Sequence, residues 1–182
     1  IRAVQEPAPR SESSLDLALC QGILKGDKMD LVVEKSTELG VGRIIPLLSQ
    51  RGQIHYTRRQ QRWKKIAIEA ERQSGRVVVP DIEQVMNMSS LLELIASDKE
   101  TRAIMFYEGE ATSPLRGMTN ATGRLYVLIG SEGGFTTEEV LRAKAAGVLI
   151  TSLGKRILRA ETAAIVGVTI AQFLYGDLAP SD

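Results

Sequence analysis

The feature that most constrains the fold is a regular alternation of short apolar runs with stretches of helical periodicity. The apolar runs are four to six residues long and recur from Asp16 onward, and helical patterns lie between most of them. Strands that alternate with helices pair in parallel, because each helix returns the chain to the same edge of the sheet. The run Leu125–Ile129 is wholly apolar apart from one tyrosine hydroxyl, which is typical of a central strand. The alternation predicts an α/β fold with a mostly parallel sheet.

Periodicity and end signals place the expected elements. Strands are expected at Leu17–Cys20, Arg43–Leu48, Arg102–Tyr107, Leu125–Ile129 and Val148–Leu153, and helices at Lys28–Leu39, Thr57–Ser74, Ser89–Ala96, Thr137–Ala146 and Glu161–Tyr175. The end signals are Asp27 and Thr136 or Thr137 as N-caps, with Gly40 and Gly75 as stops. Residues 1–15 are polar and contain two prolines, so we expect a linker or the remnant of a preceding domain, followed by one domain over 16–182.

A glycine-rich segment, Ile129-Gly-Ser-Glu-Gly-Gly-Phe135, follows the most apolar strand and precedes a helix. Ligands of open parallel sheets bind beyond the carboxyl ends of the strands, and glycines let backbone amides approach a ligand closely. The spacing of Gly130, Gly133 and Gly134 does not match the dinucleotide pattern G-x-G-x-x-G, and no phosphate-loop motif is present. Alone, the segment is compatible with either a structural turn or a cofactor site.

A second polar loop, Leu153-Gly-Lys-Arg-Ile-Leu-Arg-Ala-Glu-Thr-Ala163, also follows an expected strand. It contains three cations, a carboxylate and a hydroxyl. A helix N-terminus would explain Glu161 and Thr162, because acidic and hydroxyl side chains stabilise a first turn. It gives no reason for Arg159, which therefore marks the loop as a candidate site.

Basic residues gather in one segment, although the net charge of the chain is only +1. Between positions 51 and 76, eight basic residues stand against two acidic ones, for a net charge of +6. A solvated surface helix would account for this pattern. The alternative is a phosphate-binding surface, because lysine and arginine neutralise the nucleic-acid backbone and release counterions. On that hypothesis the RNA-binding candidates are Arg51, Arg58, Arg59, Arg62, Lys65, Arg72 and Arg76.

Several other classes of protein are disfavoured by composition. Cys20 and His55 are the only cysteine and histidine, so neither an internal disulfide nor a four-ligand zinc site is expected. We expect no metal, and Cys20 to be a buried structural thiol. No apolar run reaches the roughly 18 residues of a membrane span. Low cysteine use fits a reducing, cytoplasmic location.

Taken together, these segments resemble the RsmE family of 16S ribosomal RNA uridine-N3 methyltransferases, within the SPOUT superfamily. The resemblance covers about residues 24–178 and rests on several motifs in order. They are Lys25-Gly-Asp-Lys-Met29, Glu34-Lys-Ser-Thr-Glu-Leu-Gly-Val41, Ile45-Pro46, Gln73-Ser-Gly-Arg76, the glycine-rich segment and Leu153-Gly-x-Arg-Ile-Leu-Arg-x-Glu-Thr-Ala163. The set is specific, although no single piece is.

The resemblance implies a SPOUT fold with a deep trefoil knot near the C-terminus, one of the rare exceptions to unthreaded chains. It also implies a homodimer, S-adenosylmethionine as methyl donor, and 16S ribosomal RNA or the small ribosomal subunit as partner. On this analogy the cofactor contacts are Ile129, Gly130, Glu132, Gly133, Leu153, Gly154, Ile157, Leu158 and Thr162.

The chain departs from the family pattern in three places. Ser131 and Lys155 stand where the family usually has proline, which would restrain the backbone. Family members also carry an N-terminal RNA-binding β-barrel, which residues 1–15 are too few to encode. We therefore interpret the chain as the methyltransferase domain without that barrel.

The chemistry of the implied reaction selects three catalytic candidates. Methylation at uridine N3 requires loss of the N3 proton and stabilisation of the anionic uracil. We expect Arg159 to contact this anion or its adjacent phosphate, and Glu132 or Glu161 to accept the proton. The competing hypothesis is a non-catalytic RNA-binding or ribosome-assembly module on the same fold, which leaves both loops unexplained. A nucleotide hydrolase is disfavoured, because the phosphate-loop lysine is missing.

Overall fold

A parallel sheet forms the centre of the computed structural model, which describes residues 12–52, 58–109 and 123–179. Its strand order is β3-β2-β1-β6-β5-β7, and β4 also pairs with β2. The strands are β1 (Leu17–Gly22), β2 (Arg43–Leu48), β3 (Asp81–Ile82), β4 (Met86–Asn87), β5 (Arg102–Phe106), β6 (Leu125–Ile129) and β7 (Leu149–Thr151). The helices are α1 (Lys28–Glu38), α2 (Gln60–Ser74), α3 (Met88–Ala96), α4 (Thr137–Ala145) and α5 (Ala160–Tyr175).

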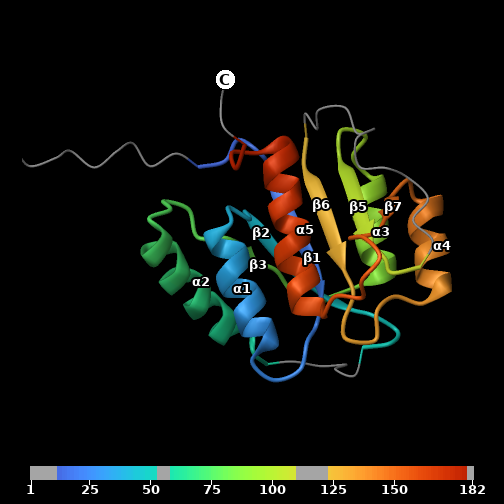
Figure 1. Ribbon diagram of the computed structural model, residues 1–182, viewed down its shortest axis with the longest axis horizontal. Coiled ribbons are helices and arrows are strands. Elements are labelled where there is room, and N and C mark those ends of the chain that lie inside the picture. The colour runs from blue at the N-terminus through green and yellow to red at the C-terminus, as the bar shows by residue number, and fades with distance from the viewer. Residues whose placement is uncertain (1–11, 53–57, 110–122, 180–182) are drawn as a thin grey trace, which may run out of the picture.

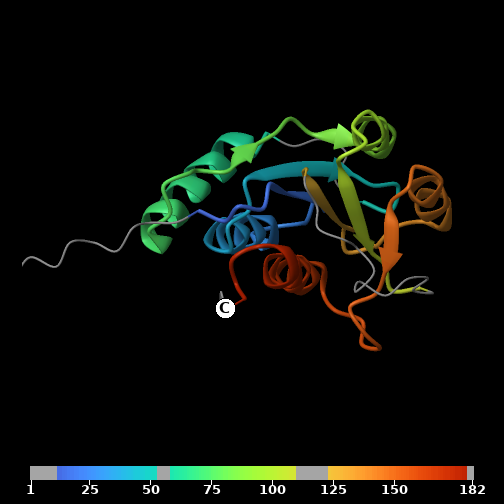
Figure 2. The same cartoon turned by 90° about the horizontal axis from the view of Figure 1, so that it is seen from above.

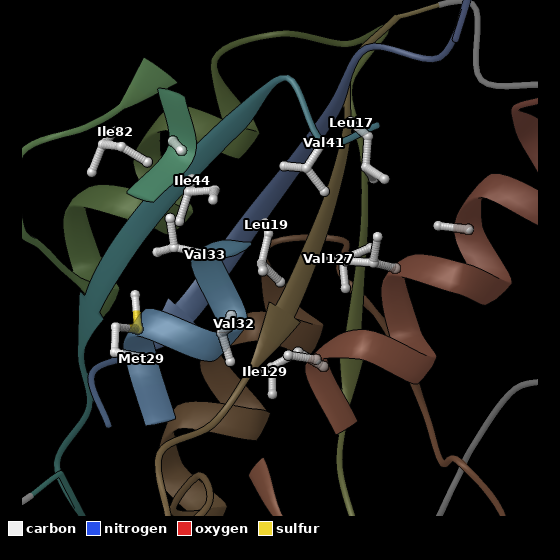
Figure 3. Packing of buried hydrophobic residues seen from close by; sticks show 14 of the residues in the cluster. Leu17, Leu19, Met29, Val32, Val33, Val41, Ile44, Ile82, Val127 and Ile129 are labelled. Carbon is white, nitrogen blue, oxygen red and sulfur yellow. The ribbon is translucent and has the colours of Figure 1, made fainter. Parts of the chain in front are cut away.

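The central strands are apolar throughout because both faces of the sheet are covered. Successive side chains of a strand point to opposite faces. In β6, Val127 and Ile129 join one core cluster, whereas Tyr126 and Leu128 join another. Figure 3 shows Val127 and Ile129 on the same face as Leu19 of β1. The prediction of a mostly parallel sheet with a buried central strand is confirmed.

Helices cover the two faces of the sheet. α1 and α5 lie side by side over the first core cluster, and α2 packs beside α1 (Figure 1). α3 lies over the opposite face (Figure 2), where α4 contributes Ala143 to the second cluster. Trp63 of α2 is fully buried and donates its indole hydrogen to Asp30 of α1 over 3.1 Å. This contact ties the basic helix to the domain.

Most of the expected end signals are found. Gly40 and Gly75 have φ of 85° and 76°, the left-handed backbone that ends a helix. Thr136 is the N-cap of α4 and forms a capping box with Glu139. Asp27 occupies the N-cap position of α1, but its side chain accepts no capping hydrogen bond. The carboxylate of Asp27 lies instead 3.9 Å from Arg62.

The structure differs from the prediction mainly at short elements and boundaries. β3 and β4 were not predicted, because two residues carry no periodicity. α2 begins at Gln60, and position 57 lies outside the described residues. Residues 12–15 belong to the packed domain: Leu15 is buried in the core and Glu12 binds Arg76. The trefoil knot remains a prediction.

Candidate active site

The glycine-rich turn after β6 is shaped by its own backbone. The amide of Gly134 donates to the carbonyl of Ser131 over 2.9 Å. Gly134 has φ of 67°, which other residues rarely adopt, and a Cβ on Gly130 would lie 2.9 Å from the Cα of Gly134. Glycine is therefore required at both positions for a turn this tight.

The second loop runs from the end of β7 to the start of α5. Gly154 turns the backbone with φ of 98°, and Arg159 is the N-cap residue of α5. Between them, Ile157 exposes 85% of its surface. An isoleucine this exposed, next to a polar loop, is available for contact with a ligand.

The two loops meet in one place. A pocket of about 340 Å³ is lined from the glycine turn by Ile129–Glu132 and Gly134–Phe135, and from the second loop by Ile157–Glu161. A smaller hollow of about 60 Å³ adjoins it and is lined by Leu153, Gly154 and Ile157 among others. The two loops that the sequence marked separately therefore line one pocket.

The strands that carry these loops, β6 and β7, are not direct neighbours in the sheet. β5 lies between β6 and β7, so residues after β5 also reach the pocket. Phe106 and Glu108 line both the pocket and the hollow, and Lys28 of α1 lines the pocket. Sequence reasoning missed all three. The position of Glu108 just beyond a predicted strand was the signal that could have found it.

Most of the expected cofactor contacts lie at this pocket or its side hollow. They are Ile129, Gly130, Glu132, Leu153, Gly154, Ile157 and Leu158. Gly133 and Thr162 line neither. A Cβ on Gly133 would come within 2.7 Å of the carbonyl oxygen of Arg51, so a glycine here leaves room for the neighbouring loop that contains Arg51. The side chain of Thr162 is exposed on α5.

Glu132 holds two segments together. One carboxylate oxygen accepts a hydrogen bond from the amide of Lys25 over 3.1 Å and another from the ammonium of Lys28 over 3.3 Å. Burial alone would raise the pKa of Glu132, but these donors outweigh it and the pKa is lowered. A carboxylate held in its charged form is a poor proton acceptor. Glu132 is better suited to fixing the turn against α1.

Glu161 and Arg159 present unused polar groups at the pocket. The Oε2 atom of Glu161 is buried and has no hydrogen-bond partner among the described residues. Arg159 is exposed at the rim, and the structure records no ion pair for it within the described part of the chain. A buried acceptor without a donor is costly, which indicates that a ligand supplies the donor.

Comparisons with known proteins now decide the family. An RNA methyltransferase domain model matches residues 11–172. The ribosomal RNA small subunit methyltransferase E of Buchnera aphidicola is 36% identical over 171 residues, which cover 91% of this chain and 66% of that protein. The crystal structure of the Neisseria gonorrhoeae enzyme of that name, bound to S-adenosyl methionine, has a TM-score of 0.88 at 35% identity, covering 95% of this chain and 72% of that one. The chain belongs to the ribosomal RNA small subunit methyltransferase E family.

The fold extends beyond this family. The Aquifex aeolicus TrmH/SpoU tRNA modifying enzyme has a TM-score of 0.58 at 14% identity, covering 86% of this chain and 74% of that one. That likeness shows the SPOUT fold alone. The chain spans about two thirds of the length of the curated methyltransferase E proteins that it matches.

The basic residues of this methyltransferase E domain fall into two groups. Lys65 and Arg72 are exposed on α2, and Arg51 and Arg58 are exposed before it. Arg59 donates to the carbonyl of Gly26, in the loop that also supplies the Lys25 amide to Glu132. The start of α2 is therefore linked to the pocket through one short loop.

Arg76 and Arg62, two of the expected RNA contacts, form ion pairs with carboxylates of the protein. The side chain of Arg76 is 10% exposed, pairs with Glu12 over 2.8 Å, and donates to the carbonyls of Thr37 and Val41. Arg62 pairs with Asp30 over 2.7 Å. The clustering of charge in the sequence could not reveal that these two arginines pair with carboxylates. We therefore exclude Arg76 from the residues proposed to bind RNA. Arg62, already paired with Asp30, is expected to contribute less to RNA binding.

The described part of this family member shows neither a membrane-spanning helix nor a cluster of metal ligands. No helix in it is long and apolar enough to cross a membrane. The same residues contain no cluster of three or more histidine, cysteine or acidic side chains that could hold a metal ion. Cys20 is buried, and burial raises the pKa of its thiol well above the usual range.

Proposed function

We propose that this chain is the catalytic domain of an S-adenosylmethionine-dependent methyltransferase that modifies N3 of a uridine in 16S ribosomal RNA. The observation that carries the proposal is the single pocket formed by the glycine turn and the Arg159 loop. Membership of the methyltransferase E family supports the substrate class, and the relative bound to S-adenosyl methionine supports the cofactor.

The residues at the pocket fit this cofactor. The glycine turn exposes backbone groups, and the side hollow offers the apolar surfaces of Leu153, Ile157 and Leu158 to a nucleoside. Glu161 has an unpaired carboxylate oxygen for a hydroxyl or ammonium group. When bound, S-adenosylmethionine supplies an electrophilic methyl group on a sulfonium.

The protein's contribution to the reaction is alignment and charge control. Arg159 stabilises the anionic uracil that forms when the N3 proton leaves, because a fixed cation acts strongly where charge develops. Glu161 is the proton acceptor we favour, since one of its oxygens is free of hydrogen bonds. Glu132 is disfavoured for this role, because Lys25 and Lys28 lower its pKa.

The RNA is proposed to approach from the start of α2. Arg51, Arg58, Arg59, Lys65 and Arg72 provide the phosphate contacts, because exposed cations bind the backbone without reading sequence. The target uridine must leave its stack to reach the pocket. The partner is 16S ribosomal RNA or the small subunit, and the proposed location is the cytoplasm.

A homodimer is part of the proposal. Phe173, Leu174 and Leu178 are exposed at 56%, 42% and 44% at the end of α5 and just after it, and Leu31 of the adjacent α1 is exposed at 39%. Exposed apolar side chains on helices that cover one face of a sheet are typical of an association surface.

Transfer of a labelled methyl group tests the function directly. The protein is incubated with labelled S-adenosylmethionine and unmodified 16S ribosomal RNA or small subunits, and the modified base is mapped. We expect label at uridine N3, and a loss of about 100-fold or more in turnover for Arg159→Ala, with cofactor affinity within a few fold. The control is Arg102→Ala, at the far end of β5.

Titration with the cofactor distinguishes this proposal from the competing hypothesis of a non-catalytic module. A non-catalytic RNA-binding module would bind RNA yet give no saturable heat on titration with S-adenosylmethionine. Near-normal turnover in Arg159→Ala would contradict the proposed role of Arg159 in the reaction. It would leave the proposed cofactor unaffected.

A further inference from the structure

A loop that belongs to neither pocket segment is fastened to the glycine turn. It follows β2 and comprises Ser49–Gly52. The hydroxyl oxygens of Ser49 and Ser131 lie 3.1 Å apart, and the two residues are only 6% and 4% exposed. Each hydroxyl is thus the buried hydrogen-bond partner of the other, and Ser131 lines the pocket.

The same loop is anchored a second time, to the first turn of α4. The amide of Gln50 donates to one oxygen of Glu139 over 2.9 Å, and the other oxygen accepts from the amide of Thr136 over 2.8 Å. Glu139 is 1% exposed, so this carboxylate serves both segments inside the protein. The backbone of Arg51 lies close to Gly133, so the loop contacts the turn at two residues, Ser131 and Gly133.

These contacts hold Ser131, which lines the pocket, so they affect the position of the backbone beside a bound ligand. The turn is also held by the hydrogen bond from the Gly134 amide to the Ser131 carbonyl, by the Gln21 side-chain amide, which donates to the Gly130 carbonyl over 3.1 Å, and by the Glu132 contacts. Removing one member of a buried hydroxyl pair leaves the other without a partner, which favours movement of the backbone that carries it. A turn that moves in the free protein must be ordered again when a ligand binds, which weakens binding.

We propose that Ser49 and Ser131 are positioning residues, which hold the glycine turn in its cofactor-binding shape before the cofactor arrives. The effect on catalysis rests on the proposed function above, whereas the effect on the turn itself does not. The pair acts on cofactor binding and not on the chemical step, because neither hydroxyl is needed for proton transfer or charge stabilisation.

Hydrogen–deuterium exchange of the protein without ligand tests the turn itself. Ser49→Ala and Ser131→Ala are compared with Ser36→Ala, which removes a buried serine hydroxyl of α1 that has no partner among the described residues. We expect exchange at amides 131–135 to rise about tenfold in the first two variants and to stay unchanged in the control. Unchanged protection of this segment in both variants would overturn the proposal, whatever the cofactor.

Cofactor titration and steady-state kinetics test the consequence. We expect the dissociation constant and KM for S-adenosylmethionine to rise about five- to tenfold in each single variant, with kcat within twofold. The double variant should be no weaker than the weaker single one, because one shared interaction is lost only once. Additive losses, or a fall in kcat at unchanged KM, would refute the positioning role. Absence of cofactor binding in the unaltered protein would refute the proposed function but not the exchange result.

Discussion

Three carboxylates at the pocket have different surroundings, and these surroundings assign them different tasks. Glu132 is held by the Lys25 amide and the Lys28 ammonium. Glu161 has a buried oxygen without a partner, and Glu108 is exposed beside Gly134. Of the three, Glu132 is the carboxylate that donors of the protein hold within the described residues. The other two remain available to a ligand that carries hydrogen-bond donors or positive charge.

Replacing Glu132 by Gln should lower stability in a pH-dependent way. The lowered pKa means that the charged form is favoured in the folded state, so its contribution is present above the ordinary glutamate value of about 4.5 and is lost as the pH falls through the lowered one. We expect a deficit below about 1 kcal/mol at pH 7, as for partly exposed ion pairs. Thermal unfolding of both proteins between pH 7 and pH 3 measures it, and a deficit that does not shrink in acid would contradict this account.

At the scale of elements, hydrophobic periodicity predicted the long, buried helices and strands. The bounds of β2 and β6 follow directly from their apolar runs, whereas the N-cap of α4 was left open between Thr136 and Thr137 and the capping box with Glu139 places it at Thr136. The position of β5 between β6 and β7 could not be predicted, because strand order depends on the path of the connections through space. For the same reason the sequence could not predict the Ser49–Ser131 contact, which joins segments distant in the chain.

The basic face of α2 yields a prediction at this scale. Lys65 and Arg72 are exposed and lie two turns apart on the same side of the helix. Replacing both by Ala should weaken RNA binding about equally for all sequences and reduce the salt dependence of binding by about one to two ion contacts. Affinities measured between 50 and 200 mM salt test this. Lys144→Ala on α4 is the control, and an equal loss in that variant would argue against a localised surface.

At the scale of the whole molecule, the helices on both faces of the sheet expose apolar side chains. α1 and α5 expose Leu31, Phe173 and Leu174, of which the last two are adjacent, whereas α3 and α4 on the opposite face expose Leu94 and Leu141 (Figures 1 and 2). The pocket opens where α5 begins, at Arg159 and Glu161. A second copy that packs on the end of α5 would bury Phe173 and Leu174, which lie at the opposite end of this helix from the pocket.

The homodimer can be tested with a matched pair of substitutions. Phe173 and Leu141 are similarly exposed, at 56% and 61%, but lie on different helices. A glutamate at Phe173 would place a charge in the proposed interface, where an unpaired buried charge costs several kcal/mol. We expect Phe173→Glu to sediment as a monomer at micromolar concentration, while Leu141→Glu and the unaltered protein sediment as dimers. Dimers that survive Phe173→Glu would place the interface elsewhere, and a monomeric unaltered protein would mean that the pocket is complete within one chain.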